Sequence, residues 1–343
     1  MVTIRDVAKA SGFSPTTVSL VLNEAPLSRY IPAETKTKIK KVAKELDYRP
    51  NVFARSLRGR RSDMVGVIVF DITDPYCTHI LRGIEGKLNA ASMAFMLTDA
   101  QNSRYRFQGS LELLMQRRIE GLILIANSMH TNPSVLDSIR KQRIPVVVIG
   151  REQSQVGSTV AVNNELGSYL ALKHLYELGH RDIAFIRGPK AILDSLTRWK
   201  GIAKFAEEAG LTVRKNLVFE LSGGPLSSRG GLEAVKHLRT QGMFTAILAF
   251  DDLTAMGVLR GLYEEGLEVP RDCSVIGFDD IDSASYYNPP LTTVRQPMTK
   301  IGEQGALMLL DAVREIRSDK NYKNSHVLIE PELVVRATTA PLS

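Results

Sequence analysis

The 343-residue chain has little of what marks secreted or membrane proteins. It has only two cysteines, Cys77 and Cys273, which give neither a disulfide framework nor the spacing of a metal site. No apolar run approaches the roughly 20 residues of a membrane-spanning helix. The first residues carry charges where a signal peptide needs an apolar core. We therefore expect a soluble protein of the cytoplasm.

Catalytic signatures are also scarce. The six histidines show no HxxxH or HExxH spacing, and no GxSxG, P-loop or GxGxxG follows a predicted strand. The aspartate pairs 251–252 and 279–280 suggest a metal or a general base, but neighbouring side chains on one chain point in different directions. We expect a protein that is not an enzyme and that uses no cofactor and no metal.

The sequence does contain a basic, helical N-terminus. Apolar spacing predicts a helix over residues 4–10, after which Gly12 breaks the chain. Ser14-Pro15 is typical of the cap and first position of a second helix, and a third is predicted over 33–46. Two short helices joined by a glycine-containing turn are typical of the helix-turn-helix motif, which enters the major groove of DNA.

The distribution of charge favours DNA binding over a plain helical domain. Residues 1–62 contain thirteen Lys+Arg and five Asp+Glu, a net charge of +8, whereas the whole chain carries +7. The rest of the chain is therefore close to neutral. Basic charge confined to one helical module is the electrostatic footprint of a phosphate-binding surface. We predict a DNA-binding headpiece over 1–50 and a linker over 51–62.

Motifs along the whole chain then point to one family. TIRDVAKASGFSPTTVSLVLN and YRPNVFARSLRGRRSDMVGVIV are followed by GHRDIAFIRGP, RWKGI, AFDDLTAMG, IGFDDID and LTTVRQPMTKIGEQG. In content and order these segments resemble the LacI/GalR (lactose/galactose repressor) family of bacterial transcriptional regulators. The resemblance covers essentially all 343 residues. It implies a homodimer that binds operator DNA and is switched by a small-molecule effector.

The resemblance also implies which residues contact DNA in the major groove. Pro15, Thr16 and Leu20 match positions that contact bases, and Thr17, Ser19 and Asn23 suit phosphate contacts. Leu20 is unusual, because many relatives carry a hydrogen-bonding or charged residue there. An apolar side chain can contact a thymine methyl group but cannot bind guanine bidentately. We predict a palindromic operator with weak dependence on guanine at that position.

The connector after Pro50 is predicted to form a short hinge helix over 51–58. An isolated helix of about two turns is marginal in water, so its folding should be coupled to DNA binding. Leu57 matches the family's leucine that wedges between base pairs, and neighbouring residues would lie near the backbone or minor groove. These neighbours are Ala54, Arg55 and Arg58. The alternative is a flexible basic linker with an incidental leucine.

From Met64 onward, apolar runs of strand length alternate with amphipathic stretches of helical length. The runs cover 64–70, 94–98, 121–125, 145–149, 158–162, 182–186, 246–250 and 274–278. This alternation predicts an α/β fold whose parallel sheets are covered by helices on both faces. The strands are too many for one sheet, so two doubly wound subdomains of periplasmic-binding-protein type fit better, as the resemblance also implies.

We expect an effector-binding and dimerisation domain over 63–343. Subdomain one would take 63–162 and 291–321, and subdomain two would take 163–290 and 322–343. The chain would cross three times between them and frame a hinged cleft. No heptad tail follows Val335, so we expect no coiled-coil tetramer.

Polar residues follow the predicted strands at their carboxyl ends, where ligands collect in such sheets. The expected effector-binding residues are Asp71, Tyr76, Asn127, Arg151, Arg198, Asp251 and Asp279. Carboxylates and a guanidinium suit a hydroxyl-rich ligand, so we expect a sugar or sugar derivative, with a nucleobase as the alternative. Asp252 could equally be a helix N-cap and Arg151 a solvated loop cation. Gly150-Arg151 also departs from the Asp or Asn of many sugar-binding relatives.

Together these features predict a transcriptional regulator that represses carbohydrate-related genes. A transport-type solute-binding protein would share the cleft but would need an export signal and no DNA-binding arm. An enzyme with such an arm would need a catalytic constellation. The sequence is compatible with both an inducer and a corepressor as the effector.

Overall fold

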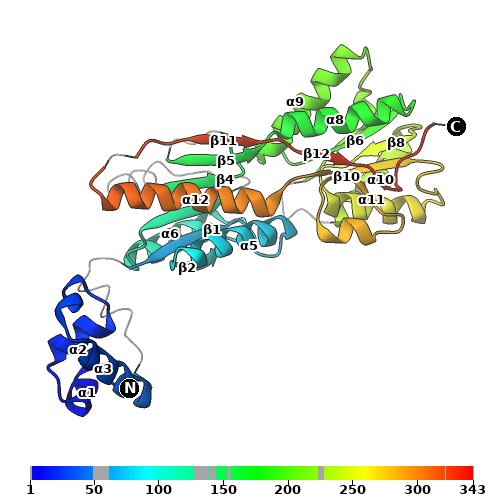
Figure 1. The fold of residues 1–343 in the computed structure, drawn as a ribbon. Coiled ribbons are helices and arrows are strands. Elements are labelled where there is room, and N and C mark those ends of the chain that lie inside the picture. The colour runs from blue at the N-terminus through cyan, green and yellow to red at the C-terminus, as the bar shows by residue number, and fades with distance from the viewer. Residues whose placement is uncertain are drawn as a thin grey trace. The chain divides into compact units, whose positions relative to one another are not determined.

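The computed structural model describes residues 2–48, 62–126, 139, 144–152, 156–222, 228–320 and 322–342. It divides into two compact units, Met1–Ser62 and Asp63–Ser343 (Figure 1). Of the predicted functional residues, Ala54, Arg55, Leu57, Arg58 and Asn127 lie outside the described ranges. Among the helices within those ranges, none combines the length and apolar character that a membrane span requires.

The first unit is a small helical domain with a helix-turn-helix motif, as predicted. Its helices are α1 (Ile4–Ser11), α2 (Pro15–Leu22), the 3-10 helix η1 (Pro26–Tyr30) and α3 (Ala33–Glu45). Gly12 takes a φ of 78° in the turn, and the Ser14 hydroxyl accepts a hydrogen bond from the Thr17 amide at 3.1 Å. Val18 and Ile39 are completely buried between the helices. The cap and the glycine thus fix where α2 begins.

The second unit contains two six-stranded sheets. The first has the order β11-β5-β4-β3-β1-β2, and all of its pairs are parallel. Its strands are β1 (Met64–Val69), β2 (Ala94–Asp99), β3 (Gly121–Ile125), β4 (Val146–Ile149), β5 (Ser158–Val162) and β11 (His326–Ile329).

The second sheet has the order β12-β10-β9-β8-β6-β7 and is parallel except for the pairing of β12 with β10. Its strands are β6 (Ile183–Arg187), β7 (Val218–Glu220), β8 (Ala246–Leu248), β9 (Ser274–Asp279), β10 (Thr292–Arg295) and β12 (Glu332–Val334).

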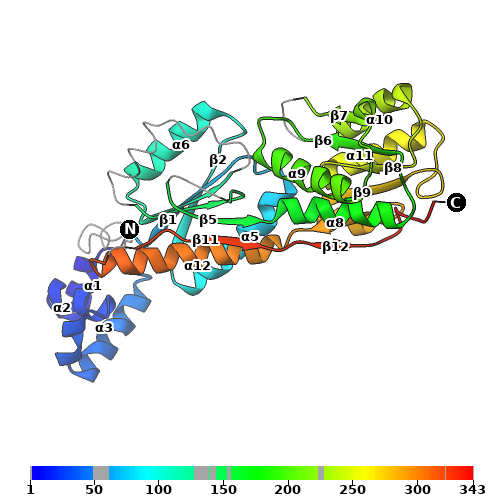
Figure 2. The ribbon, with the colours of Figure 1, turned by 90° about the horizontal axis from the view of Figure 1, so that it is seen from above.

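Helices cover both faces of each sheet, which confirms the predicted fold class (Figures 1 and 2). On the first sheet, α6 (Arg104–Gln116) packs on one face, and α5 (Pro75–Ala90) and α12 (Met298–Arg317) pack on the other. On the second, α8 (Asn164–Glu177) and α9 (Leu193–Glu208) lie opposite α10 (Ser228–Gln241) and α11 (Asp252–Glu264). Val67 and Ile68, adjacent on β1, belong to the two different cores. We call each sheet with its helices a subdomain.

Two crossings between the subdomains differ from the predicted ones. The residues of β10 were expected in subdomain one, but they pair with β9 in the second sheet. The residues of β11 were expected in subdomain two, but they pair with β5 in the first. The chain therefore crosses after Arg295 and again after Ile329. Both strands have only four residues and are partly polar or half-exposed, so the apolar pattern does not reveal them.

Candidate functional site

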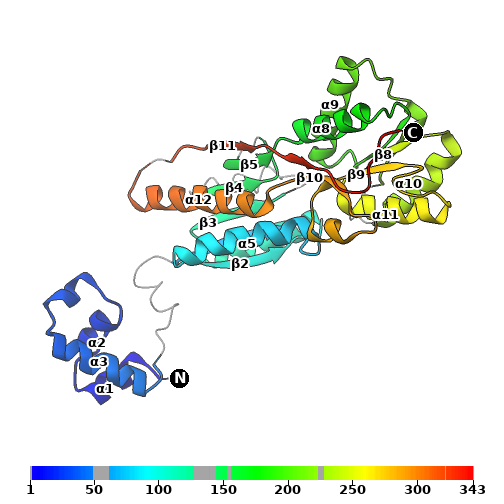
Figure 3. The same cartoon turned by 45° about the vertical axis from the view of Figure 1, so that its right-hand side comes forward.

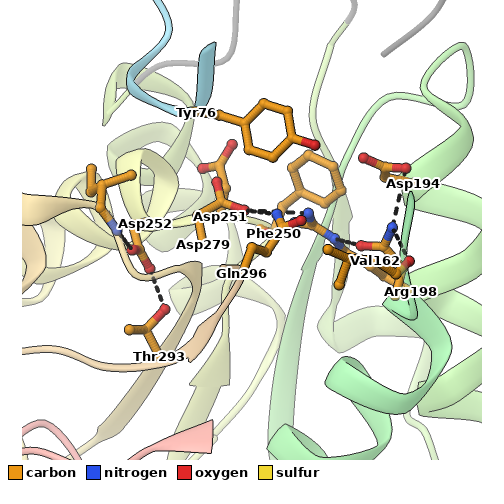
Figure 4. A network of polar contacts seen from close by, with 12 residues as sticks. Tyr76, Val162, Asp194, Arg198, Phe250, Asp251, Asp252, Asp279, Thr293 and Gln296 are labelled. Carbon is orange, nitrogen blue, oxygen red and sulfur yellow. Dashed lines mark hydrogen bonds and ion pairs between the residues drawn. The ribbon is translucent and has the colours of Figure 1, made fainter. Parts of the chain in front are cut away.

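The second subdomain holds Arg198 in a buried network of hydrogen bonds (Figure 4). Its guanidinium, on α9, donates to Asn164 Oδ1 at 2.9 Å and to the Phe250 carbonyl oxygen at 2.5 Å, and lies 3.4 Å from Asp279 Oδ1. Arg198 is only 7% exposed, and its guanidinium carbon lies 3.6 Å from the centre of the Phe278 ring. A planar cation that is both stacked and hydrogen-bonded keeps one orientation.

Asp279 ends β9 in a strained turn. Asp279 has a φ of 121° and the next residue, Asp280, a φ of 57°, conformations that cost non-glycine residues roughly 1–3 kcal/mol each. The Gln296 amide donates to Asp279 Oδ1 at 2.6 Å. Arg295 and Arg336 each donate to the carboxylate of Asp280 at 2.6 Å. These bonds hold the turn and fix the carboxylate of Asp279 beside Arg198.

The two aspartates at the start of α11, Asp251 and Asp252, have different roles. The helix N-cap is not Asp252, the residue that the sequence suggested for that role. Asp251, not Asp252, caps the helix: its carboxylate accepts from the Thr254 amide at 2.7 Å. Asp252 is completely buried and accepts from the Ile281 amide at 2.9 Å and from the Thr293 hydroxyl at 2.5 Å. The side chain of Asp252 therefore connects α11 to the turn after β9 and to β10.

Burial raises the pKa of several carboxyl groups around Arg198. The groups are Asp74, raised to about 6, Asp252, raised to about 7, and Asp194, Asp251 and Asp279, raised above the ordinary value. Asp74 caps α5 in the first subdomain, and the carboxylate of Asp251 in the second raises its pKa further. Arg198 opposes the rise at Asp194, Asp251 and Asp279. The carboxyl ends of both sheets thus share one electrostatic environment.

The first subdomain contributes an aromatic ring and a cation. Tyr76, in the first turn of α5, stacks against Phe70 with ring centres 6.5 Å apart, and its hydroxyl end is directed toward the side of Phe250 and Asp194 (Figure 4). Burial, with Asp194 and Asp279, raises the pKa of Tyr76 well above 10, so its hydroxyl stays protonated. Burial lowers the pKa of Arg151, and the nearby carboxylate of Asp194 opposes that change.

The structure thus brings four of the expected effector residues together: Tyr76, Arg198, Asp251 and Asp279. Arg151 lies within electrostatic range of Asp194. Asp71 accepts from Thr73 at 2.6 Å and from Asn102 at 3.2 Å, both within its own subdomain.

Sequence reasoning missed four members of this network: Asn164, Asp194, Phe250 and Gln296. Phe250 was predicted as the last residue of the strand over 246–250, but β8 ends at Leu248, so the available signal was only its position next to Asp251. Gln296 follows a strand that the sequence pattern did not reveal. Among the described residues, no group of three His, Cys, Asp or Glu side chains is placed to hold a metal ion.

The expected DNA contacts lie on or around α2. Pro15, Thr16 and Asn23 are exposed, and Thr17, Ser19 and Leu20 are half-buried. The Asn23 amide donates to the backbone oxygen of Ser19 at 2.9 Å, and the hydroxyls of Ser14 and Thr17 lie 2.9 Å apart. The start of α2 therefore presents small polar groups and one apolar side chain, Leu20.

Comparisons with known proteins agree with both units. Residues 3–51 match the profile of bacterial regulatory proteins of the lacI family, and residues 172–339 match that of a periplasmic binding protein-like domain. The chain is 34% identical over 346 residues to the HTH-type transcriptional repressor PurR of Actinobacillus pleuropneumoniae serotype 3, covering 100% of both chains.

Two solved structures extend the comparison to the fold. One is a lac repressor dimer bound to operator and the anti-inducer ONPF, with a TM-score of 0.86 and 26% identity over 99% of both chains. The other is a LacI family transcriptional regulator from Enterococcus faecium with bound ribose. It has a TM-score of 0.71 and 29% identity and covers 82% of this chain and 100% of its own.

Proposed function

Since the chain belongs to the lacI family of bacterial regulatory proteins, we propose that it represses transcription by binding operator DNA as a dimer. The family consists of transcriptional regulators and not of enzymes. The lac repressor dimer on its operator supports the proposal, as does the net charge of +8 over residues 1–62. A connector over 51–62 that orders on the operator, with Leu57 between base pairs, stays a prediction.

We infer that the effector is a nucleobase and not the sugar that the acidic residues suggest. The observation that carries this choice is the 34% identity, over the full length of both chains, to a repressor named PurR, a purine repressor. The chemistry of the site agrees with it. Tyr76 and Phe250 offer aromatic rings to a flat heterocycle, and Asp251 and Asp279 can accept from ring N–H and amino groups.

The charge of the site favours a free base over a nucleotide. Four aspartates, Asp74, Asp194, Asp251 and Asp279, surround it, and the cations among its members are Arg198 and Arg151. Arg198 already binds Asp279 and the Phe250 carbonyl. A phosphate group would therefore be repelled by carboxylates that outnumber the cations. A neutral base carries no charge and would not be repelled.

A sugar is the second candidate. The related regulator from Enterococcus faecium holds ribose, and carboxylates accept hydrogen bonds from hydroxyls as readily as from N–H groups. The two candidates differ in how far their binding depends on the aromatic ring of Tyr76, because both rings of a purine would stack on it.

A ligand screen separates the candidates. The full-length protein is melted with adenine, guanine, uracil, ribose, glucose and adenosine monophosphate. A ligand present at one hundred times its Kd adds about 2.7 kcal/mol to the free energy of unfolding, and thus raises Tm by roughly 5–10 °C. We expect this shift with a purine base and a smaller one with the monophosphate. Shifts with ribose or glucose alone would reject the nucleobase and leave the regulator proposal standing.

The recognition of DNA is tested at Leu20. The operator is selected from random DNA and each base pair is then varied against the wild type and Leu20→Arg. We expect a palindromic site, and a gain in guanine preference of roughly 10- to 100-fold in the variant at the position facing residue 20. Leu27→Arg is the control, because it adds the same charge at an exposed site on η1. Equal guanine preference in the wild type and Leu20→Arg would contradict the assignment.

A further inference from the structure

Helix α12 extends from the candidate effector site to the beginning of the second unit. It has 20 residues and is therefore about 30 Å long. Two residues before its first turn, Gln296 donates to Asp279 at 2.6 Å. Its last residue, Arg317, lies at the other end and contacts Asp63, the first residue of the unit. One helix thus joins the network around Arg198 to the point where the DNA-binding unit is attached.

At the C-terminal end of α12, Arg317, Glu120 and Asp63 are each hydrogen-bonded to the other two. Arg317 Nε donates to Glu120 Oε2 at 2.8 Å, and Arg317 Nη2 donates to Asp63 Oδ1 at 2.8 Å. The Asp63 amide donates to Glu120 Oε1 at 2.6 Å. Because Glu120 directly precedes β3 and Asp63 directly precedes β1, the guanidinium binds the starts of two strands at once. This two-carboxylate geometry distinguishes Arg317 from an ordinary surface ion pair, whose contribution is small.

Helices α12 and α5 pack with their backbones in contact. A Cβ added to Gly83 of α5 would overlap the Thr299 carbonyl oxygen, and a Cβ added to Gly302 of α12 would overlap that of Ile80. The two backbones are therefore in contact, and the helices lie lengthwise against each other (Figures 1 and 3). Since α5 carries Tyr76 in its first turn, both helices begin at the effector site.

We propose that Arg317 is a positioning residue that couples the effector site to the DNA-binding unit. A shift of α5 and α12 on effector binding is carried along their length and reaches Asp63 through Arg317, so the connector starts from a different position. The inference rests on the proposed function. Without the Arg317 contacts the helices still respond to the effector, but the start of β1 no longer follows them.

The coupling is measured as the ratio of operator Kd values with and without a saturating purine base, adenine or guanine, in the full-length protein. We expect Arg317→Gln to bring this ratio at least fivefold closer to one. The Kd of the DNA-free protein for the base should stay within twofold of the wild type. Arg317→Lys keeps the charge but cannot bridge both carboxylates, so its ratio should fall between those of wild type and Arg317→Gln.

Arg314→Gln is the matched control. Arg314 lies on the same helix and pairs with Asp311 at 3.0 Å, and both side chains are about two-thirds exposed (69% and 68%). We expect its ratio to equal that of the wild type. An unchanged ratio in Arg317→Gln, or an equal loss in Arg314→Gln, overturns the proposal.

A second measurement needs no effector. Hydrogen exchange is measured in the ligand-free protein for the peptide that contains the Asp63 amide. The network at the other end of α12 is perturbed with the variant Gln296→Leu. We expect Gln296→Leu alone to increase the exchange rate severalfold over the wild type. In the double variant with Arg317→Gln, it should cause no further increase over Arg317→Gln alone. If no purine base binds, the effector proposal fails and the exchange experiment still decides the coupling. If bases bind and shift operator affinity but neither readout depends on Arg317, the coupling alone is rejected.

Discussion

The two subdomains have the same sheet order, but they contribute different chemistry to the site between their strand ends. In the second, Arg198 and Gln296 are buried, and both donate to the carboxylate of the partly exposed Asp279. In the first, Tyr76 and Arg151 are only half-buried. The second subdomain therefore presents a polar surface that is already ordered, and the first adds an aromatic ring to it. The same sheet order thus supports a hydrogen-bonded polar network in one subdomain and an aromatic side chain in the other.

The outermost strands account for part of this difference. Strand β11 is parallel to β5, whereas β12 is antiparallel to β10 and places Glu332 opposite Arg295. Arg295 donates to Glu332 and also to Asp280, the residue after Asp279. The antiparallel edge thus braces the strained turn that orients the carboxylate of Asp279.

The comparison predicts that Arg198→Met has the largest effect. The substitution removes the donor to the buried Phe250 carbonyl and one of the two side-chain donors to Asp279, so the free energy of unfolding should fall by about 3–5 kcal/mol and effector affinity by more than about 100-fold. Urea denaturation and calorimetric titration measure the two effects. Arg214→Met is the control, because Arg214 is 37% exposed in its pair with Asp182 and should lose less than about 1 kcal/mol. Equal losses in both variants would show that the network is not ordered in advance.

The next largest effect is expected from Asp252→Asn, in the pH dependence of stability. Burial raises the pKa of Asp252 from 3.8 to about 7, so the folded protein binds this proton more tightly than the unfolded chain. Its stabilising contribution is complete below about pH 4 and is lost as the pH rises through 7. An asparagine cannot ionise. The fall in the free energy of unfolding between pH 5 and pH 8 should therefore be smaller in the variant, by roughly 2–3 kcal/mol.

Asp272→Asn serves as the control for this experiment. The carboxylate of Asp272 is exposed, and its hydrogen bonds from Arg271 lower its pKa. Its contribution is therefore constant above about pH 4, and the variant should keep the slope of the wild type between pH 5 and pH 8. Parallel pH profiles for Asp252→Asn and wild type would show that Asp252 does not carry the slope.

In the first subdomain we expect a binding effect with little loss of stability. Tyr76→Ala should weaken a purine base about 10- to 100-fold, since stacking of a base on an aromatic ring is worth roughly 1–3 kcal/mol. Tyr76→Phe keeps the ring and should stay within about threefold. Tyr105→Ala removes a tyrosine that is 89% exposed on α6 and should leave the Kd unchanged. If Tyr76→Ala bound the base normally, the first subdomain would not supply the stacking surface.

The smallest effect is expected from Asp71→Asn. Its carboxylate accepts from Thr73 and Asn102 in its own subdomain, so an amide that keeps some of these bonds should change the free energy of unfolding by about 1 kcal/mol or less. Titration calorimetry should show an effector Kd within about threefold of the wild type. A tenfold loss would mean that the first subdomain also supplies a carboxylate.

Features set by local physics could be predicted from the sequence. The third helix was expected over 33–46 and covers Ala33–Glu45, because its buried face and its ends depend on neighbouring residues. The central parallel strands were found because both of their faces are buried, which makes them continuous apolar runs. The edge strands β7, β11 and β12 have three or four residues and half-exposed side chains, so they lack that pattern.

The site was predicted only in part for the same reason. Asp251 and Asp279 lie at the ends of apolar strands, so position suggests them, whereas Arg198 lies inside α9 and is suggested mainly by the family resemblance. Their partners Asn164 and Gln296 come from segments far away in the chain, which the sheet topology brings to the same place. Which of two adjacent aspartates caps α11 depends on one residue of helix register, and apolar spacing does not resolve that difference.

The position of β11 and β12 near the end of the chain affects how the protein is made. On the ribosome the DNA-binding helices emerge first, while both sheets stay one strand short until residues 326–334 have been synthesised. A prematurely terminated product would carry an operator-binding module on sheets with open edges, which favour aggregation.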